Sequence, residues 1–171
     1  MKKLLIVIDM QNDFIDGSLG TKEAEAIVPA VKAKIASYPP KEVIATMDTH
    51  GPDYLKTQEG RNLPVEHCIK GTDGWKIRPD IAELLDKAII YEKPTFGCEK
   101  LAADLKNVKG LKEVEMIGLC TDICVVSNAL LIKAALPEIR ISMDSACCAG
   151  VTPEKHLAAL ETMRSCQIEV V

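Results

Sequence analysis

Six short apolar segments alternate with segments of helical periodicity, and this alternation limits the possible folds more than any other feature of the sequence. The first segment, residues 3–10, contains a continuous apolar run that is typical of a central parallel strand covered on both faces. The other predicted strands comprise residues 42–47, 88–91, 114–119, 139–143 and 167–171. The predicted helices comprise residues 24–37, 81–85, 98–105, 122–135 and 153–164.

Strands connected by helical crossovers build a mostly parallel sheet, because right-handed βαβ units place helices on both of its faces. We therefore predict an α/β fold with a doubly wound, mostly parallel six-stranded sheet between two layers of helices. The length of 171 residues fits one domain spanning residues 1–171. Ligands bind such sheets beyond the carboxyl ends of the strands, where the strand order reverses. A functional site is expected at that edge.

The charge balance argues against a nucleic-acid or membrane partner. The net charge is −4, the isoelectric point is near 5.4, and the lysines are scattered rather than clustered. The first apolar run stops at Asp9 with no small-residue cleavage site after it, so no signal peptide is predicted. Seven cysteines, an odd number without paired C-x-x-C spacing, favour reduced thiols. We expect a cytoplasmic protein that acts on a small molecule.

Four of the predicted strands lead into residues that can carry chemistry. Asp9, Asp48 and Lys93 follow the first three strands, and Cys124 lies just beyond the fourth. A thiol near a helix N-terminus feels the positive end of the helix dipole, which favours the thiolate. Taken singly, each residue also fits a structural role: a turn-capping aspartate, a solvated lysine or an inert core cysteine. The turn after the first strand lacks the glycines of a dinucleotide-binding loop.

A second group of residues has the chemistry of a metal site. Asp48 and His50 lie on one side of an extended chain and can address the same divalent ion, with His67 supplied from the long loop that follows. Glu59 or a water molecule could complete the ligand set. A pair of hydrogen-bonded loop histidines is the alternative interpretation.

Together these residues give the chain a clear resemblance to the isochorismatase-like cysteine hydrolases, and within them to the nicotinamidase branch. The resemblance runs nearly end to end and rests on residues 7–14 (VIDMQNDF), 48–50 (DTH), 67–72 (HCIKGT), 92–94 (EKP) and 118–125 (GLCTDICV). These motifs are specific for the superfamily but not for a substrate.

The resemblance implies a catalytic triad of Asp9, Lys93 and Cys124, and a metal ion held by Asp48, His50 and His67. It also implies a cis peptide bond before Cys120 and an oxyanion hole made by the backbone N–H groups of Cys120 and Cys124. The expected cofactor is a divalent metal, zinc with iron or manganese as alternatives, and no organic cofactor. Self-association into a homo-oligomer is expected on the same ground.

The implied reaction is metal-assisted hydrolysis of a small amide to a carboxylic acid and ammonia through a thioester. Candidate pocket residues are Phe14, Trp75 and Phe96, while Thr49 stands where nicotinamidases have an aromatic residue after the metal-binding Asp. Nicotinamide or a similar amide is the leading substrate, and a carbamoyl compound, a ureido compound or an enol ether is the alternative. A non-catalytic metal or thiol protein is the alternative from another class.

Overall fold

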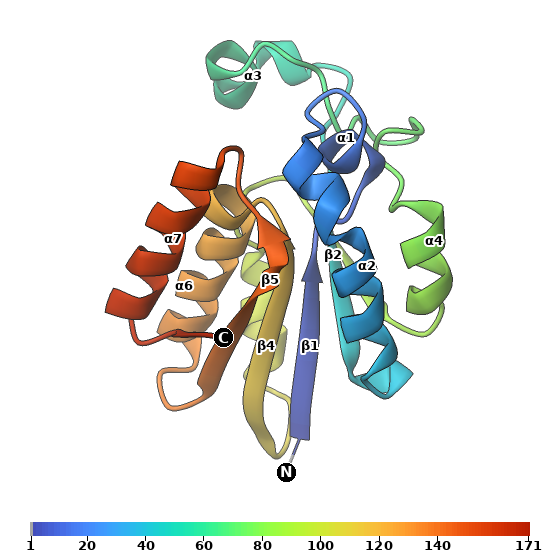
Figure 1. Cartoon of the computed structure of the whole chain (residues 1–171). Helices are drawn as coiled ribbons and strands as arrows, with labels where there is room; N and C mark the ends of the chain where they lie inside the picture. Colours follow the sequence, from blue (N-terminus) through green and yellow to red (C-terminus); the bar gives the residue numbers. More distant parts are fainter. Residues whose placement is uncertain (1) are drawn as a thin grey trace.

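The computed structural model describes residues 2–171 and contains one six-stranded sheet (Figure 1). All strand pairs are parallel, and the spatial order is β3-β2-β1-β4-β5-β6. The strands are β1 (Lys2–Ile8), β2 (Val43–Asp48), β3 (Ile89–Lys93), β4 (Leu111–Leu119), β5 (Arg140–Ala149) and β6 (Glu169–Val170). The order runs outward from β1 in one direction and from β4 in the other, so the sheet is doubly wound, as predicted. The carboxyl ends of β1 and β4 form the switch point where ligands bind in such folds.

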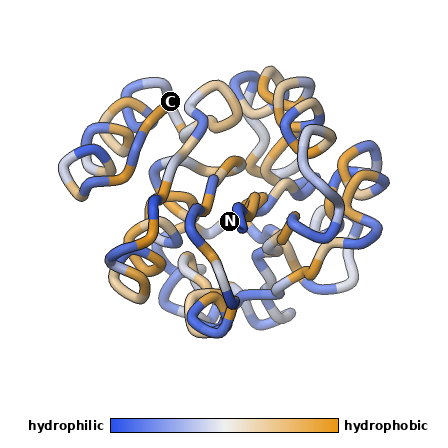
Figure 2. Tube along the Cα trace, turned by 90° about the horizontal axis from the view of Figure 1, so that it is seen from below, coloured by the Kyte–Doolittle hydropathy of each residue, from blue (hydrophilic) through white to orange (hydrophobic). Residues whose placement is uncertain are grey.

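Helices cover both faces of the sheet (Figure 1). They are α1 (Asn12–Ile15), α2 (Lys22–Ala36), α3 (Gln58–Asn62), α4 (Pro79–Ala82), α5 (Glu99–Leu105), α6 (Val126–Ala135) and α7 (Pro153–Ser165). In Figure 1, α2 and α4 lie on one side of the sheet, and α6 and α7 lie on the other. Seen from below in Figure 2, apolar stretches gather toward the middle, while the surrounding helices alternate hydrophilic and hydrophobic residues.

The alternation of side chains along β1 explains the two-sided core. Leu4, Ile6 and Ile8 point to the hydrophobic cluster that includes residues of α5, α6 and α7. Leu5 and Val7 point to the opposite cluster, which includes residues of α2. Each of these five side chains is at most 2 % exposed, so the continuous apolar run serves both cores.

Helix capping agrees with the sequence. Thr21 caps α2 by accepting a hydrogen bond from the backbone N–H of Ala24. Thr152 caps α7 in the same way through Lys155, with Pro153 at the first helical position. Both helices begin within two residues of their predicted starts.

Several elements differ from the predictions. β4 begins at Leu111 rather than at residue 114, and the short helices α1 and α3 were not predicted. β5 continues to Ala149 rather than ending near residue 143, since its second half pairs with β4 beyond an irregularity between Met116 and Gly118. That second half has few β-branched residues, so its sequence carries no strand pattern. β6 comprises only residues 169 and 170. The helix predicted to start at residue 122 instead opens with a π-helical turn over Thr121–Val125, and α6 follows at Val126.

β1 and β4 come unusually close together just before the site. Gly118 has a φ of +120°, and a Cβ on it would lie 2.1 Å from the carbonyl oxygen of Ile8. Only glycine fits this contact, because any side chain would overlap the backbone of β1. The glycine therefore lets the two central strands bring their carboxyl ends side by side.

The long loop after β2 is partly structured. It contains a 3₁₀ turn over Tyr54–Lys56 followed by α3, which rises above the sheet in Figure 1. The loop returns to the sheet edge through a bridge between His50 and Ile69. Within residues 2–171, no helix has both the length and the apolar character needed to cross a membrane.

Candidate functional site

Strand ends bring one lysine, two carboxylates and one thiol together. Lys93 Nζ lies 2.7 Å from Asp9 Oδ2, 3.3 Å from Asp48 Oδ1 and 3.4 Å from Cys124 Sγ. Asp48 and Lys93 are the last residues of β2 and β3 and stand opposite each other in the parallel register. Asp9 directly follows β1, and Cys124 lies in the π-helical turn after β4. All four side chains are at least 96 % buried.

The backbone and Thr46 fix the carboxylate of Asp9. Asp9 has a φ of +48°, a left-handed conformation that is uncommon for residues other than glycine. The hydroxyl of Thr46, which is fully buried in β2, donates a hydrogen bond of 2.6 Å to Asp9 Oδ1. Oδ2 is thereby left facing Lys93.

The turn that carries Cys124 is held by Asn128, one helical turn further along the chain. The amide of Asn128 donates to the carbonyl oxygens of Cys124 (2.8 Å) and Phe96 (3.1 Å), and accepts from the backbone N–H of Cys98. The peptide bond between Leu119 and Cys120 is cis, in agreement with the family resemblance. Single π-helical turns are frequent at functional sites, and here the turn presents the sulfur to Lys93.

Burial dominates the electrostatics of the thiol. Full burial raises the pKa of Cys124 well above its usual value, the Asp9 carboxylate raises it further, and Lys93 opposes both. Burial thus opposes the thiolate, which the position near a helix N-terminus favours. A raised pKa favours the protonated thiol, which needs a base before it can act as a nucleophile.

Asp9 and Lys93 have the properties of a base and its supporting cation. Burial raises the pKa of Asp9 above the usual carboxyl range, and Lys93 acts in the opposite direction. Burial disfavours the charge on Lys93, but the carboxylates of Asp9 and Asp48 outweigh it and raise the pKa of the ammonium. Lys93 is therefore positively charged at neutral pH and stabilises an anion on either neighbour.

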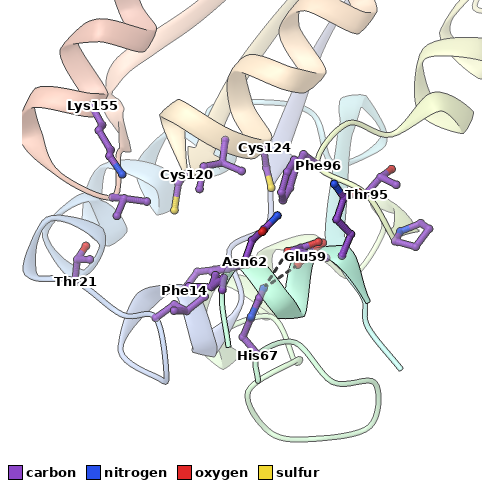
Figure 3. Close-up of a pocket in the computed structure, with 17 residues that line it drawn as sticks. Phe14, Thr21, Glu59, Asn62, His67, Thr95, Phe96, Cys120, Cys124 and Lys155 are labelled. Atoms are coloured by element: carbon purple, nitrogen blue, oxygen red, sulfur yellow. Dashed lines mark ion pairs between the residues drawn. The ribbon is translucent and has the colours of Figure 1, made fainter. Parts of the chain in front are cut away.

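Four side chains beside this group could hold a metal ion: Asp48, His50, Glu59 and His67. One ligand atom from each lies within 4.8 Å of all the others. The Nε2 atoms of the two histidines are 2.8 Å and 3.6 Å from Asp48 Oδ2, and both are 3.7 Å from Glu59 Oε1. Figure 3 shows Glu59 and His67 facing each other beneath Cys124. The sequence named all four residues, with Glu59 as the optional ligand.

The residues present fit a divalent ion. His50 Nε2 is buried and makes no hydrogen bond within the described residues, although Asp48 Oδ2 is only 2.8 Å away. The ring nitrogen is thus not aimed at that oxygen as a donor. Two imidazoles with two carboxylates also form a nitrogen and oxygen donor set that suits zinc, iron and related ions.

Neighbouring groups orient the two histidines. His67 Nδ1 lies 2.9 Å from the carbonyl oxygen of Val65, which fits an Nδ1–H donor and leaves Nε2 free as a ligand. The ring of Tyr54, fully buried, packs against both imidazoles at centroid distances of 4.8 and 4.9 Å. Its hydroxyl donates to the carbonyl oxygen of Leu63.

Several positioning residues carried only weak sequence signals. Gln11 lies in the first motif and Thr46 lies in β2, so neither stood out in the sequence. Both are fully buried, and their hydrogen bonds show that Gln11 holds Asp48 and that Thr46 holds Asp9. Asn128 is the one amide in the mostly apolar segment from Val125 to Ile132, which could have marked it. His156 is half-buried and pairs with the Thr121 hydroxyl at 2.8 Å.

A cavity of about 610 Å³ opens onto Cys120, Cys124 and three of the four candidate metal ligands, Asp48, Glu59 and His67. Phe14 and Phe96 line it, as predicted (Figure 3). Trp75 does not line it, contrary to the prediction. The indole N–H of Trp75 instead donates to the hydroxyl of Thr49 at 2.9 Å, which holds the ring outside the cavity.

The isochorismatase domain family model matches residues 3–171. The chain is 30 % identical to the nicotinamidase/pyrazinamidase of Mycobacterium tuberculosis, with 99 % of this chain and 98 % of that protein covered. The structure of Pyrococcus horikoshii pyrazinamidase in complex with zinc matches with a TM-score of 0.82, 29 % identity and coverage of 100 % and 99 %. The nicotinamidase/pyrazinamidase structure from Bacillus subtilis matches with a TM-score of 0.85, 27 % identity and full coverage of both chains. The chain described here therefore belongs to the isochorismatase family.

Proposed function

We propose that the chain is a metal-assisted cysteine amidohydrolase that converts nicotinamide, or a similar small amide, to the carboxylic acid and ammonia. The observation that carries the proposal is the position of Lys93 Nζ between Asp9 Oδ2 (2.7 Å) and Cys124 Sγ (3.4 Å). This arrangement pairs a nucleophile with a base and a charge-stabilising cation. The similarity to nicotinamidase/pyrazinamidase proteins supports an amide as the substrate.

In the first half of the reaction, Asp9 accepts the thiol proton of Cys124 as the sulfur attacks the amide carbonyl carbon. Lys93 stabilises the negative charge that develops during this transfer, and the backbone N–H groups of Cys120 and Cys124 are the proposed donors to the oxyanion. Asp9 then returns the proton to the departing nitrogen as the C–N bond breaks. Ammonia leaves, and the acyl group remains on Cys124 as a thioester.

In the second half, a water molecule attacks the thioester carbonyl and gives one proton to Asp9. The C–S bond breaks, the carboxylic acid leaves, and Asp9 returns the proton to the sulfur. The raised pKa of Asp9 suits this role, since it makes the carboxylate a stronger proton acceptor than an exposed one.

The ligand group for the metal would be Asp48, His50, His67 and Glu59, with zinc as the proposed ion. When bound, such an ion supplies a Lewis acid that holds and orients a ring nitrogen or another donor atom of the substrate. Asp48 also contacts Lys93 (3.3 Å), so the residue that would bind the metal adjoins the catalytic group. We further propose a cytoplasmic location, which the seven free cysteines support.

Release of ammonia from a panel of small amides tests the proposal. The zinc-loaded protein is expected to release ammonia from nicotinamide, and Cys124→Ala is expected to abolish release. Cys166→Ala serves as the matched control, because it removes a cysteine that directly follows the last residue of α7 and does not line the cavity. This variant is expected to keep wild-type activity. Full activity of Cys124→Ala would contradict the mechanism. Hydrolysis of ureido compounds or enol ethers, with every amide left intact, would contradict the substrate class.

A further inference from the structure

The cavity next to Cys124 is larger and more apolar than the catalytic group requires. Its volume of about 610 Å³ lies within the roughly 300–1,000 Å³ range of pockets that take drug-sized ligands. Asp48, Glu59, His67 and Cys124 account for one part of its wall. Most of the remaining wall is made by the apolar side chains of Phe14, Leu19, Leu63, Pro94, Phe96, Ile123 and Val151.

The wall offers little for clamping a single aromatic ring. Thr49 binds the indole N–H of Trp75 and thereby keeps the only tryptophan out of the cavity. Of the two phenylalanines, Phe14 packs against His67 at a centroid distance of 5.5 Å, and Phe96 is 45 % exposed at the mouth. Aliphatic side chains and a proline make up the other apolar contacts.

The mouth of the cavity is itself apolar. Leu63, Phe96 and Val151 are 37 %, 45 % and 38 % exposed, and they come from three separate segments, after α3, β3 and β5. Large apolar side chains that converge at the rim of a cavity mark a surface that a ligand covers. Lys155 is the one charged lining residue outside the metal-ligand group; it lies exposed in the first turn of α7 and has no ion-pair partner among residues 2–171.

We infer that the preferred substrate is an amide whose acyl group carries an extended apolar body, longer than a single ring, that reaches from Cys124 to Leu63 and Phe96 at the rim. This inference rests on the proposed amide hydrolysis and names the substrate class for it. The carboxamide lies at Cys124, and the apolar body covers the aliphatic wall. Nicotinamide fills only the inner part of the cavity.

Binding of straight-chain primary amides to zinc-loaded Cys124→Ala, measured by calorimetry alongside nicotinamide, tests the inference without turnover. Each added methylene is expected to tighten binding by about fourfold until the chain reaches the rim, since burial of each methylene contributes about the same free energy of binding. The same series is expected to raise kcat/KM of the wild-type enzyme.

Truncation of the side chains at the rim, compared with truncation of a surface leucine elsewhere, separates loss of substrate recognition from loss of protein stability. In Leu63→Ala and Phe96→Ala, each methylene added to the longest amides is expected to increase the binding affinity less than it does in the protein with an intact rim. Leu157→Ala is the matched control, because this leucine is 64 % exposed on α7 and lies outside the cavity. It is expected to keep the full dependence.

Two results would overturn the inference: nicotinamide binding as tightly as every longer amide, or an amide with a terminal carboxylate binding more tightly than the alkyl amide of equal length. The second result would make Lys155 the anchor of an acidic substrate. A chain-length dependence in binding without hydrolysis of any amide would uphold recognition of an apolar body by the cavity and refute the proposed reaction instead.

Discussion

The side-chain amide of Gln11 makes two hydrogen bonds with the main chain of Asp48. Gln11 Nε2 donates to the Asp48 carbonyl oxygen at 2.8 Å, and Gln11 Oε1 accepts from the Asp48 N–H at 2.7 Å. Gln11 is fully buried. The segment after β1 thus sets the position of the residue that contacts both Lys93 and the two histidines.

Replacement of Gln11 by alanine is expected to weaken metal binding. The change leaves two buried backbone groups of Asp48 without partners and frees its carboxylate to move. Loss of such supporting contacts lowers metal affinity by about 10- to 100-fold. Zinc titration by calorimetry measures the effect, with Asn12→Ala as the control, because the side chain of Asn12 donates only to the carbonyl oxygen of Asp73 at the surface. Equal zinc affinities of the two variants would count against this role.

Removal of the Lys93 charge is expected to change the pH dependence of turnover. Asp9 must be ionised to act as a base, so activity falls as the pH drops through its raised pKa. Lys93 lowers that pKa, and Lys93→Met is therefore expected to move the acidic limb of kcat/KM to higher pH.

The same variant is expected to lose at least about 100-fold in kcat/KM at neutral pH. Lys106→Met, a change at the end of α5, controls for the loss of one surface charge. An acidic limb at the wild-type pH would show that Lys93 does not act on Asp9.

Glu115 contributes stability that depends on pH. It is buried in β4, receives ion pairs from Lys3 (2.8 Å) and Lys34 (2.7 Å), and accepts a hydrogen bond from Tyr38. Burial alone would raise its pKa, but the lysines outweigh burial and lower the pKa to about 2. Because the folded-state value lies below the unfolded one, the contribution is complete above about pH 4.5 and is lost as the pH falls toward 2.

Glu115→Gln is accordingly expected to lower the free energy of unfolding at pH 7 by about 2 kcal/mol, less than for a fully buried pair because both lysines are partly exposed. The difference from wild type should shrink between pH 4.5 and pH 3 in urea titrations. A constant difference across that range would contradict the assignment of the pKa to this ion-pair group.

The contact of Gly118 with β1 is expected to make this position intolerant of a side chain. Gly118→Ala would combine backbone strain with a contact of 2.1 Å to the carbonyl oxygen of Ile8, at a cost of about 3 kcal/mol. Gly110→Ala is the matched control, because Gly110 also has a positive φ (+73°) but no atom within 4 Å of the added Cβ. It should cost only about 1 kcal/mol. Equal losses of stability in thermal unfolding would rule out the steric argument.

The sequence predicted the architecture well because its strongest signals are local. The continuous apolar run of β1 follows from the side chains of that segment alone. The strand ends then predicted which residues meet at the sheet edge, since parallel strands place their carboxyl ends together.

What the sequence could not supply depends on contacts between distant segments. The orientation of Trp75 is set by a hydroxyl 26 residues away, at Thr49. The second half of β5 is a strand because β4 lies beside it, despite a weak local pattern. The raised pKa of Cys124 follows from its burial and from the Asp9 carboxylate, both of which depend on the whole fold.

The identity of the residue that carries the acyl group is the central claim, and intact-mass analysis of rapidly quenched turnover mixtures tests it most directly. The account predicts one acyl adduct per chain, mapped by peptide sequencing to Cys124 and absent from Cys124→Ala. An adduct on Cys68 or Cys120, or steady turnover without any adduct on Cys124 under conditions that trap thioesters, would contradict it.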